Sequence, residues 1–233
     1  MRNYITLIRN CSILRTIYFN YKVLPFNKAW KLPVLVGKRV RFRNIGTVIL
    51  SDNLKNKVHL ATLPMFNTTK YMETIWDNKG TVHINGPIVI ASSSVIHVGE
   101  KGHLIFEGEN RVGAHTSILC ENSISIGKKT GISWYSQICD SDFHFFKDRS
   151  SPIIHPRSYP ITIGEKVWVG NHCIIGKGVK IADGCICGMG SLVIKTCETP
   201  NTLLLGSPAK PKKNGVARIF DSAEEAQLIQ LLG

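Results

Sequence analysis

The chain has 233 residues, 43% of them apolar, which is enough to form a hydrophobic core in one domain. No run of about 18 apolar residues occurs, so the sequence predicts no membrane-spanning helix. The seven cysteines include no C-x-x-C pair, which argues against a zinc finger or a disulfide framework and favours reduced thiols in a cytoplasmic protein.

The formal net charge of +13 is concentrated near the N-terminus. Residues 1–43 contain ten Lys or Arg, and the first acidic residue is Asp52. The rest of the chain has 19 basic and 16 acidic residues, a net charge of only +3. A basic end on a nearly neutral body indicates an arm that meets a membrane surface, a phosphate-bearing ligand or a nucleic acid. We do not expect the body to bind nucleic acid, because it has no basic patches interleaved with aromatic residues.

Residues 1–33 form a basic N-terminal segment whose spacing predicts an amphipathic helix. Arginines interrupt its apolar run, so it is not a secretory signal, whereas a mitochondrial presequence has a similar composition. Two interpretations stay open: the helix lies on a membrane surface, or it packs its apolar face on its own body or on a neighbouring subunit. The basic face comprises Arg2, Arg9, Arg15 and Lys22, and the apolar face comprises Tyr4, Leu7, Ile8, Cys11, Leu14, Tyr18 and Tyr21.

Residues 34–198 are expected to form one repetitive β structure. From Ile163 the sequence repeats in sixes without a gap, as IGEKVW, VGNHCI, IGKGVK, IADGCI and CGMGSL. A strand of about six residues with a glycine-assisted corner forms one side of a triangular coil, and its first position points inward. Residues eighteen apart then stack, which places Ile163 under Ile181. The same pattern is looser upstream, at Val98-Gly99, Val112-Gly113 and Ile126-Gly127.

A polar and aromatic segment over residues 140–162, beginning DSDFHFFKDRSS, interrupts the coil as an inserted loop. Loops that leave a regular scaffold often carry function. Residues 199–233 are expected to form a tail with turns at Thr199-Pro200 and at Gly206-Ser207-Pro208. Its last part predicts a helix that begins after Asp221, with Glu224 completing a capping box.

Tandem sixes, an SDFH loop, ITIGEKVWVG and GSPAK occur here in one order. Over about residues 80–213 the chain resembles the hexapeptide-repeat acyltransferases, in particular the maltose/galactoside O-acetyltransferases and those of capsule and lipopolysaccharide synthesis. The resemblance implies an all-β fold, a left-handed parallel β-helix that assembles as a homotrimer. It also implies direct transfer of an acetyl group from acetyl-CoA to a sugar hydroxyl of a surface polysaccharide or its precursor, without an acyl-enzyme.

His144, in the SDFH motif, matches the catalytic His of that family. An imidazole titrates near neutral pH, which suits a general base that takes the proton of a sugar hydroxyl. Asp142 or Asp140 could fix its tautomer, and we favour Asp142 because it is closer in sequence. Asp140, Trp134 and Tyr135 are candidates for acceptor binding, since aromatic faces suit sugar C–H surfaces; packing in the coil wall is the alternative for the two aromatic residues.

The resemblance places a coenzyme groove between neighbouring coils of the trimer. Lysines on this groove would meet the coenzyme phosphates as point charges. The sequence GMGS has Met where the family usually has Ala, which narrows one side of the groove. The family's upstream Asn is absent from RVGAHTS, where His115 is the polar residue, so the acceptor is expected to be a different sugar. The predicted groove residues are Trp168, Asn171, Met189, Gly190, Lys195, Lys210 and Lys213.

Other functions remain alternatives at this point. A nucleotide-sugar N-acetyltransferase usually has a further N-terminal nucleotide-binding domain, and a serine O-acetyltransferase usually has an N-terminal helical domain, for which residues 1–30 are too short. A noncatalytic β-helix scaffold with a basic arm for membrane or nucleic acid is the alternative from another class. No metal site is expected, because no H-x-x-x-x-H pair occurs. We expect a cytoplasmic enzyme that contacts the inner face of the cytoplasmic membrane through residues 1–43.

Overall fold

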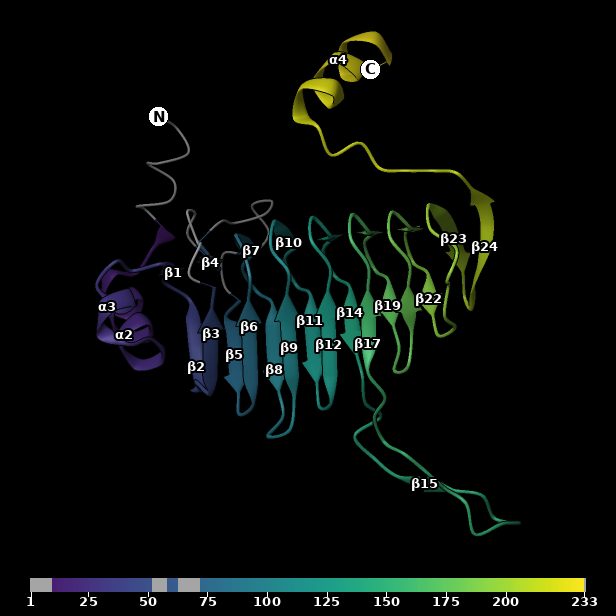
Figure 1. Cartoon of the computed structure of the whole chain (residues 1–233), viewed down its shortest axis with the longest axis horizontal. Coiled ribbons are helices and arrows are strands. Elements are labelled where there is room, and N and C mark those ends of the chain that lie inside the picture. Colours follow the sequence, from purple (N-terminus) through teal and green to yellow (C-terminus); the bar gives the residue numbers. More distant parts are fainter. Residues whose placement is uncertain (1–9, 52–57, 63–71, 233) are drawn as a thin grey trace.

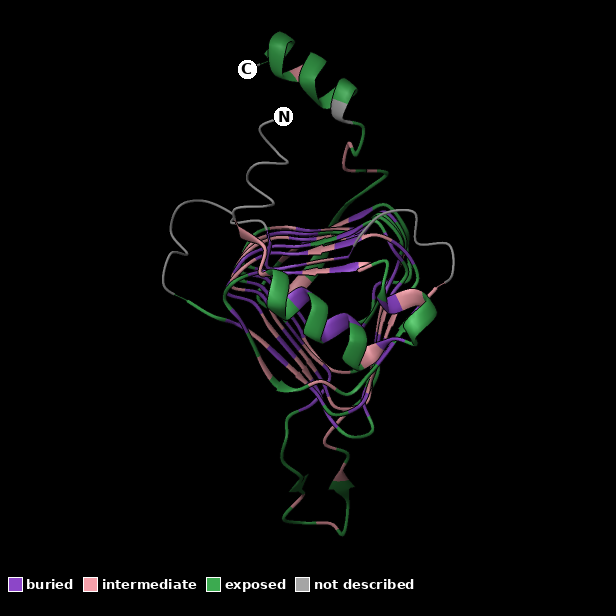
Figure 2. Ribbon diagram, turned by 90° about the vertical axis from the view of Figure 1, so that its left-hand side faces the viewer, coloured by how far each residue is buried: buried purple, intermediate pink, exposed green. Residues whose placement is uncertain are grey.

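The computed structural model describes residues 10–51, 58–62 and 72–232, and most of them form one long coil of β-strands (Figure 1). The strands form three sheets along the coil, in which neighbouring strands are parallel except at the final hairpin, and Figure 2 shows the triangular cross-section that they enclose. We call these sheets the first, second and third walls. The buried core is the column of apolar side chains inside the triangle.

The first wall contains β1 (Val34–Val36), β4 (Val58–Leu60), β7 (Ile88–Ile90), β10 (Asn110–Val112), β13 (Gly131–Ile132), β18 (Trp168–Val169), β21 (Ile186–Cys187), β23 (Thr202–Gly206) and β24 (Ala209–Asn214). The second wall contains β2 (Val40–Asn44), β5 (Thr74–Asn78), β8 (Val95–Val98), β11 (Ser117–Cys120), β14 (Gln137–Cys139), β19 (Ile174–Ile175) and β22 (Leu192–Val193). The third wall contains β3 (Thr47–Leu50), β6 (Thr81–Ile84), β9 (His103–Phe106), β12 (Ser123–Ile126), β17 (Ile161–Ile163) and β20 (Lys180–Ile181).

The predicted stacking of the last coils is confirmed. Ile163 pairs with Ile181, and Val169 pairs with Cys187. The first-position side chains from Ile163 to Val193 are at most 2% exposed, so they fill the interior as expected. The earlier coils are longer, since Val98 pairs with Cys120, and this is why the pattern of six is loose there.

The fifth hexad positions are also buried, which explains two of the cysteines. Cys173 and Cys185 lie at corners of the coil with no exposed surface, and all seven cysteines are free thiols. Burial raises the pKa of the Cys185 thiol to about 11. A protonated, buried thiol is unreactive, so these residues act as small packing groups.

Two helices cover the N-terminal end of the coil: α2 (Ile13–Val23) and α3 (Phe26–Ala29). Figure 2 looks onto this end and shows α2 lying across the triangular opening. Phe19 enters the opening, where its ring stacks on Phe42 at 5.2 Å and meets Trp76 edge-on at 5.5 Å. The helix therefore closes one end of the hydrophobic column.

The side of α2 that packs on the coil is not its apolar face. The buried residues of α2 are Thr16, Phe19 and Asn20, whereas Leu14 is 81% exposed and Tyr18 is 53% exposed. The interpretation in which the predicted apolar face packs on the chain's own body is thus wrong for Leu14, Tyr18 and Tyr21. Tyr4, Leu7 and Ile8, which complete that predicted face, lie outside the described residues, as do Arg2 and Arg9.

The inward face of α2 is polar because it completes the open edge of β1. The Asn20 side chain donates to the carbonyl of Val34 at 2.7 Å and accepts from its amide at 3.1 Å. The hydroxyl of Thr16 accepts from the amide of Val36 at 3.0 Å. Buried backbone groups at a sheet edge need such partners, and this requirement determines which face of the helix turns inward.

The C-terminal part forms a hairpin and a helix. β23 and β24 are antiparallel and the GSPAK motif makes their turn, so the predicted tail contains strands that the sequence did not indicate. The helix α4 (Ser222–Leu232) begins as predicted, because Asp221 accepts from the amides of Ala223 at 2.7 Å and Glu224 at 3.0 Å. Within the described part of the chain, every helix is too short or too polar to cross a membrane.

Candidate active site

Two edges of the triangular coil carry the residues that the sequence predicts to be functional. The first corner joins the first wall to the second and comprises residues 91–94, 113–116, 133–136, 170–173 and 188–191. The second corner joins the second wall to the third and comprises residues 45–46, 79–80, 99–102, 121–122, 140–160, 176–179 and 194–196. The inserted loop leaves the coil at the second corner, and its tip is the hairpin of β15 (Phe146–Lys147) and β16 (Ile154–His155), which projects from the coil (Figure 1).

Asp140 anchors the base of the inserted loop. Its carboxylate is fully buried and accepts from the backbone amides of Glu121 at 2.7 Å and Asn122 at 2.9 Å. Burial raises the pKa of Asp140, although these amides stabilise its charged form. The expected contact of Asp140 with an acceptor stays a prediction, and this buried position does not favour it.

His144 lies on the outgoing limb of the loop and is exposed. Within residues 10–51, 58–62 and 72–232, its side chain has no hydrogen bond or ion pair. Phe143, the residue before it, has a φ of +59°, and its amide donates to the Ser141 hydroxyl at 2.9 Å. This turn brings the ring of Phe143 to 6.2 Å from the ring of His97 on the second wall. The imidazole of His144 is therefore available to a substrate on a limb that is held at its base.

Asp142 contacts a lysine of the next coil. Its carboxylate forms an ion pair with the ammonium of Lys177, and its amide donates to the carbonyl of Arg157 at 2.8 Å. Lys177 also donates to the carbonyl of Pro156 at 3.1 Å, so it joins both limbs of the loop. The role of Asp142 in orienting His144 stays a prediction, since the described contact of its carboxylate is with Lys177.

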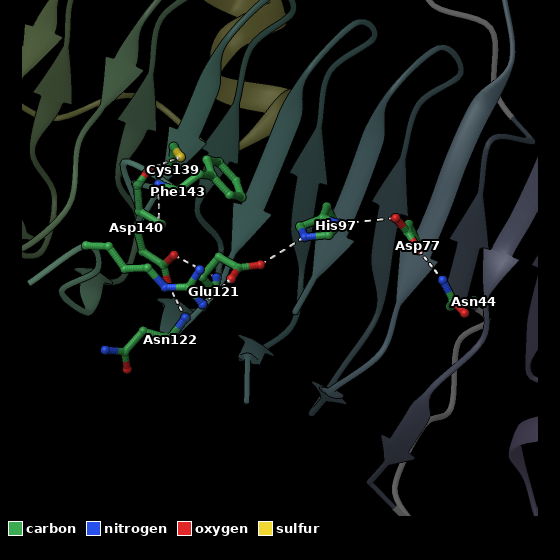
Figure 3. A network of polar contacts seen from close by, with 10 residues as sticks. Asn44, Asp77, His97, Glu121, Asn122, Cys139, Asp140 and Phe143 are labelled. Carbon is green, nitrogen blue, oxygen red and sulfur yellow. Dashed lines mark hydrogen bonds and ion pairs between the residues drawn. The ribbon is translucent and has the colours of Figure 1, made fainter. Parts of the chain in front are cut away.

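A chain of polar contacts crosses the second wall and ends at the loop (Figure 3). Asn44 donates to Asp77 at 2.7 Å, and His97 lies between two carboxylates, 3.2 Å from Asp77 and 3.1 Å from Glu121. The other oxygen of Glu121 accepts from Arg157, on the returning limb, at 3.0 Å. Burial opposes ionisation of Asp77, but the hydrogen bonds from Asn44 and His97 outweigh it and lower the pKa of Asp77.

This chain of polar contacts is not among the features predicted from the sequence. His97 and Asp77 are neighbours because β5 and β8 pair in register, Asp77 beside His97. The spacing of twenty residues in these early coils differs from the eighteen of the regular hexads, so the pattern of six does not bring the two residues together. Residues along β5 and β8 alternate between inward and outward positions, and Asp77 and His97 both occupy outward positions. An alternating pattern in these two segments is the sequence signal that could have revealed the contact between Asp77 and His97.

A cleft of about 770 Å³ opens between the second corner and the loop. Its coil side includes Lys79, His97 and Lys101, and its loop side includes Phe145 and Arg157. A second hollow of about 240 Å³ lies on the other side of His97, where Phe143 covers the second wall. His144 stands between Phe143 and Phe145, so both hollows adjoin the limb that carries it.

The first corner contains a stack of three aromatic rings. His115 and Tyr135 are 4.5 Å apart between ring centres and nearly parallel at 3°, and Tyr135 and His172 are 5.0 Å apart at 6°. All three residues have a φ between +56° and +59°, because each occupies the same turn position in successive coils. Stacking thus holds the ring of Tyr135 in place, and this packing explains an aromatic residue at this position without a sugar contact. Its predicted role in acceptor binding stays untested.

Four other predicted residues share the first corner. The amide of His172 donates to the carbonyl of Trp134 at 3.2 Å, and the amide of Gly190 donates to the carbonyl of Asn171 at 2.9 Å. Met189 is 73% exposed, and a methyl group added at Gly190 would meet no atom within 4 Å. The turn at Met189 and Gly190 therefore leaves an open strip of backbone beside the stack.

Trp168 lies on β18, in the first wall next to this corner. Its indole nitrogen donates to the hydroxyl of Ser133 at 3.2 Å. The guanidinium of Arg218, from the segment before α4, lies 5.0 Å above its ring and 5.1 Å from the ring of Phe220. Arg218 is not among the predicted residues, because nothing in the sequence links the C-terminal tail to β18.

The remaining predicted residues lie at the second corner and on the last strand of the first wall. Lys195 lies at the second corner, and Lys210 and Lys213 are exposed on β24. In one chain, the loop with His144 and the turns of Asn171 and Met189 are separated by the second wall. A single chain therefore does not bring the predicted base and the predicted coenzyme residues together. Among the described residues, no group of three or more His, Cys, Asp or Glu side chains could hold a metal ion.

Comparison with curated proteins shows relatives over most of the chain. It is 29% identical over 209 residues to an uncharacterized 24.8 kDa protein in the cps region of Klebsiella pneumoniae, with 89% of each chain covered. Over 53 residues it is 45% identical to galactoside O-acetyltransferase of Escherichia coli, which covers 23% of this chain and 26% of that one. No model of a known protein family matches the chain.

Solved structures share the fold. The polysialic acid O-acetyltransferase OatWY is 18% identical, with a TM-score of 0.55, and the match covers 84% of this chain and 94% of that one. A variant of AntD, an N-acyltransferase from Bacillus cereus crystallised with dTDP-4-amino-4,6-dideoxyglucose and coenzyme A, is 16% identical, with a TM-score of 0.53 and coverage of 86% and 89%. The triangular coil is thus the left-handed parallel β-helix.

The repeats, the coil and the named relatives together define the class of this protein. The chain is similar to the hexapeptide-repeat acyltransferases, and it is an acyltransferase.

Proposed function

We propose that this protein transfers an acetyl group from acetyl-CoA to a hydroxyl of a sugar in a surface polysaccharide or its precursor. The observation that carries the proposal is His144, exposed on an anchored loop limb and located in the motif that matches the family's catalytic His. The names of the relatives support it, because they include a galactoside O-acetyltransferase and a polysialic acid O-acetyltransferase. The coenzyme A in the AntD crystal supports the donor.

In this proposal, His144 is the general base. Its neutral imidazole accepts the proton of the sugar hydroxyl while the hydroxyl oxygen forms a bond to the acetyl carbonyl carbon. The carbon–sulfur bond then breaks, and the leaving thiolate takes the proton from the imidazolium. The products are a sugar acetyl ester and free coenzyme A, and His144 returns to its neutral form. No acyl-enzyme forms, so no Ser or Cys nucleophile is needed.

The first corner suits the donor. An extended pantetheine chain needs an uncovered strip of backbone, and the turn at Met189 and Gly190 offers one. Trp168 would pack beside the thioester, with Asn171 in the next turn. Lys210 and Lys213, on β24, would face the phosphates of the coenzyme, and Lys195 would reach them from the second corner of the neighbouring subunit.

The separation of the two corners favours a shared site in a homotrimer. His144 stands at the second corner, whereas Asn171 and Met189 stand at the first. A threefold assembly of parallel coils would place the second corner of one chain against the first corner of the next. Each site would then take its base from one subunit and its coenzyme groove from the neighbour, in the cytoplasm where acetyl-CoA is available.

Release of free thiol from acetyl-CoA tests this proposal. The full chain is incubated with acetyl-CoA and a mixture of neutral and acidic sugars, and in a second arm with amino sugars. We expect release that depends on the hydroxyl acceptors. Thiol release only with amino sugars would indicate transfer to nitrogen and contradict transfer to oxygen. Thiol release no faster with any acceptor than without one would contradict the proposal as a whole.

A further inference from the structure

The outward face of α2 and α3 is an exposed apolar surface on the N-terminal end of the coil. We call it the N-terminal face. Leu14 is 81% exposed and Phe26 is 74% exposed, which is unusual for side chains of this size. The members of the N-terminal face are Ile13, Leu14, Ile17, Tyr18, Tyr21, Phe26 and Trp30.

The fold cannot bury this face by turning the helix. Asn20 and Thr16 form hydrogen bonds with the edge of β1, and Phe19 packs in the opening of the coil. These three side chains define one side of α2, so Leu14 and Tyr18 must lie on the other. The aromatic pair of Tyr21 and Phe26, 6.0 Å apart, continues the same surface from α2 to α3.

The segment that carries the N-terminal face has charged residues of one sign in its sequence. Residues 10–51 contain eight Lys or Arg and no Asp or Glu. Lys22 lies in the last turn of α2, and Lys31 lies 5.8 Å from the ring of Trp30. A second copy of the same face would meet like charge. A nucleic acid has the negative charge to complement these Lys and Arg residues, but it would not bury the apolar side chains of Ile13, Leu14 and Ile17.

We propose that the N-terminal face docks on the surface of an anionic lipid bilayer. Apolar and aromatic side chains enter the headgroup region, while surrounding Lys and Arg side chains contact lipid phosphates. Aromatic residues are well suited to this interface, and Trp30 and Tyr18 lie on the face. If the protein is the proposed trimer of parallel coils, three such faces point the same way and bind one bilayer together.

Vesicle co-sedimentation of the full chain tests the docking surface. The probes are vesicles of phosphatidylcholine alone and vesicles of phosphatidylcholine with phosphatidylglycerol. We expect binding only to the second, and a loss of at least about tenfold in the variant that carries Leu14→Ser and Phe26→Ser. The matched control carries Leu231→Ser and Leu232→Ser on α4, which removes two equally exposed leucines elsewhere, and it should bind like the wild type.

The test separates this surface from the proposed chemistry. Both variants should keep the thermal unfolding of the wild type and its thiol release with soluble sugars, because the changed residues lie outside the predicted site. Absence of wild-type binding to the anionic vesicles would overturn the docking proposal. The docking proposal would also be overturned if the α2–α3 variant bound the anionic vesicles as tightly as the wild type. If no vesicle binding occurred and this variant lowered the oligomer size, a second copy of the chain would be the partner that covers the N-terminal face.

Discussion

Glu121 and Arg157 meet at 3.0 Å, and this contact ties the second wall to the returning limb of the inserted loop. The same carboxylate contacts His97 with its other oxygen at 3.1 Å. One half-buried side chain of the coil thus holds both the polar chain and the loop. The position of His144, on the opposite limb of that loop, depends on such contacts at its base.

Replacing Glu121 by Gln should loosen the loop without unfolding the coil. The Arg157 side chain is 42% exposed and so partly screened by solvent, and loss of its ion pair should therefore lower the unfolding free energy by no more than about 1 kcal/mol. We expect kcat to fall about tenfold, because misplacement of a base lowers the rate more than it lowers binding. Glu100→Gln is the control, since Glu100 borders the same cleft without belonging to the polar chain. Wild-type kcat in Glu121→Gln would show that this contact does not position the loop.

Asp77 gives the polar chain a defined pH dependence. Its pKa in the folded protein is lowered, so Asp77 contributes stability above its ordinary pKa of about 3.8, and this contribution is lost as the pH falls through the lower folded value. In Asp77→Asn the loss of stability on acidification should therefore be smaller than in the wild type. Urea unfolding at a series of acidic pH values measures this, and parallel curves for the two proteins would count against it.

Phe19→Ala should be strongly destabilising, because it opens the N-terminal end of the hydrophobic column. Phe19 is 1% exposed, and removal of a buried Phe costs about 3–5 kcal/mol. Tyr18→Ala, one residue away on the exposed face, should cost less than about 1 kcal/mol. Chemical denaturation of the two variants provides the comparison. Equal losses would mean that α2 does not close the coil in solution.

A shared site predicts complementation between two inactive variants. His144→Ala removes the base and Trp168→Ala alters the coenzyme side, so each homotrimer should be inactive. In randomly mixed trimers, about a quarter of the interfaces combine an intact loop with an intact first corner, and about a quarter of wild-type activity should return. Co-expression with two different affinity tags isolates the mixed species. If mixed trimers stay inactive, the two residues act within one chain.

The regular part of the coil could be predicted from sequence because each of its residues sits at a fixed place in a repeat of six. Ile163 and Ile181 stack for that reason. The polar chain could not be predicted, since Asp77 and His97 belong to coils of another length. The orientation of α2 could not be predicted either. Hydrophobic spacing favours burial of Leu14 and Tyr18, but the hydrogen bonds of Asn20 and Thr16 to β1 outweigh it. The motif at His144 identified the loop, whereas its contacts with Lys177 and Arg157 required the fold.

Transfer of labelled acetyl from acetyl-CoA to an oligosaccharide acceptor tests the central claim most directly. The full chain and its His144→Ala variant are compared, with His155→Ala, a loop histidine paired with Asp148 at 3.1 Å, as the matched control. We expect label on a sugar hydroxyl with the wild type and with His155→Ala, and a rate at least about 100-fold lower in His144→Ala with unchanged thermal unfolding. Transfer by His144→Ala at the wild-type rate would contradict the account.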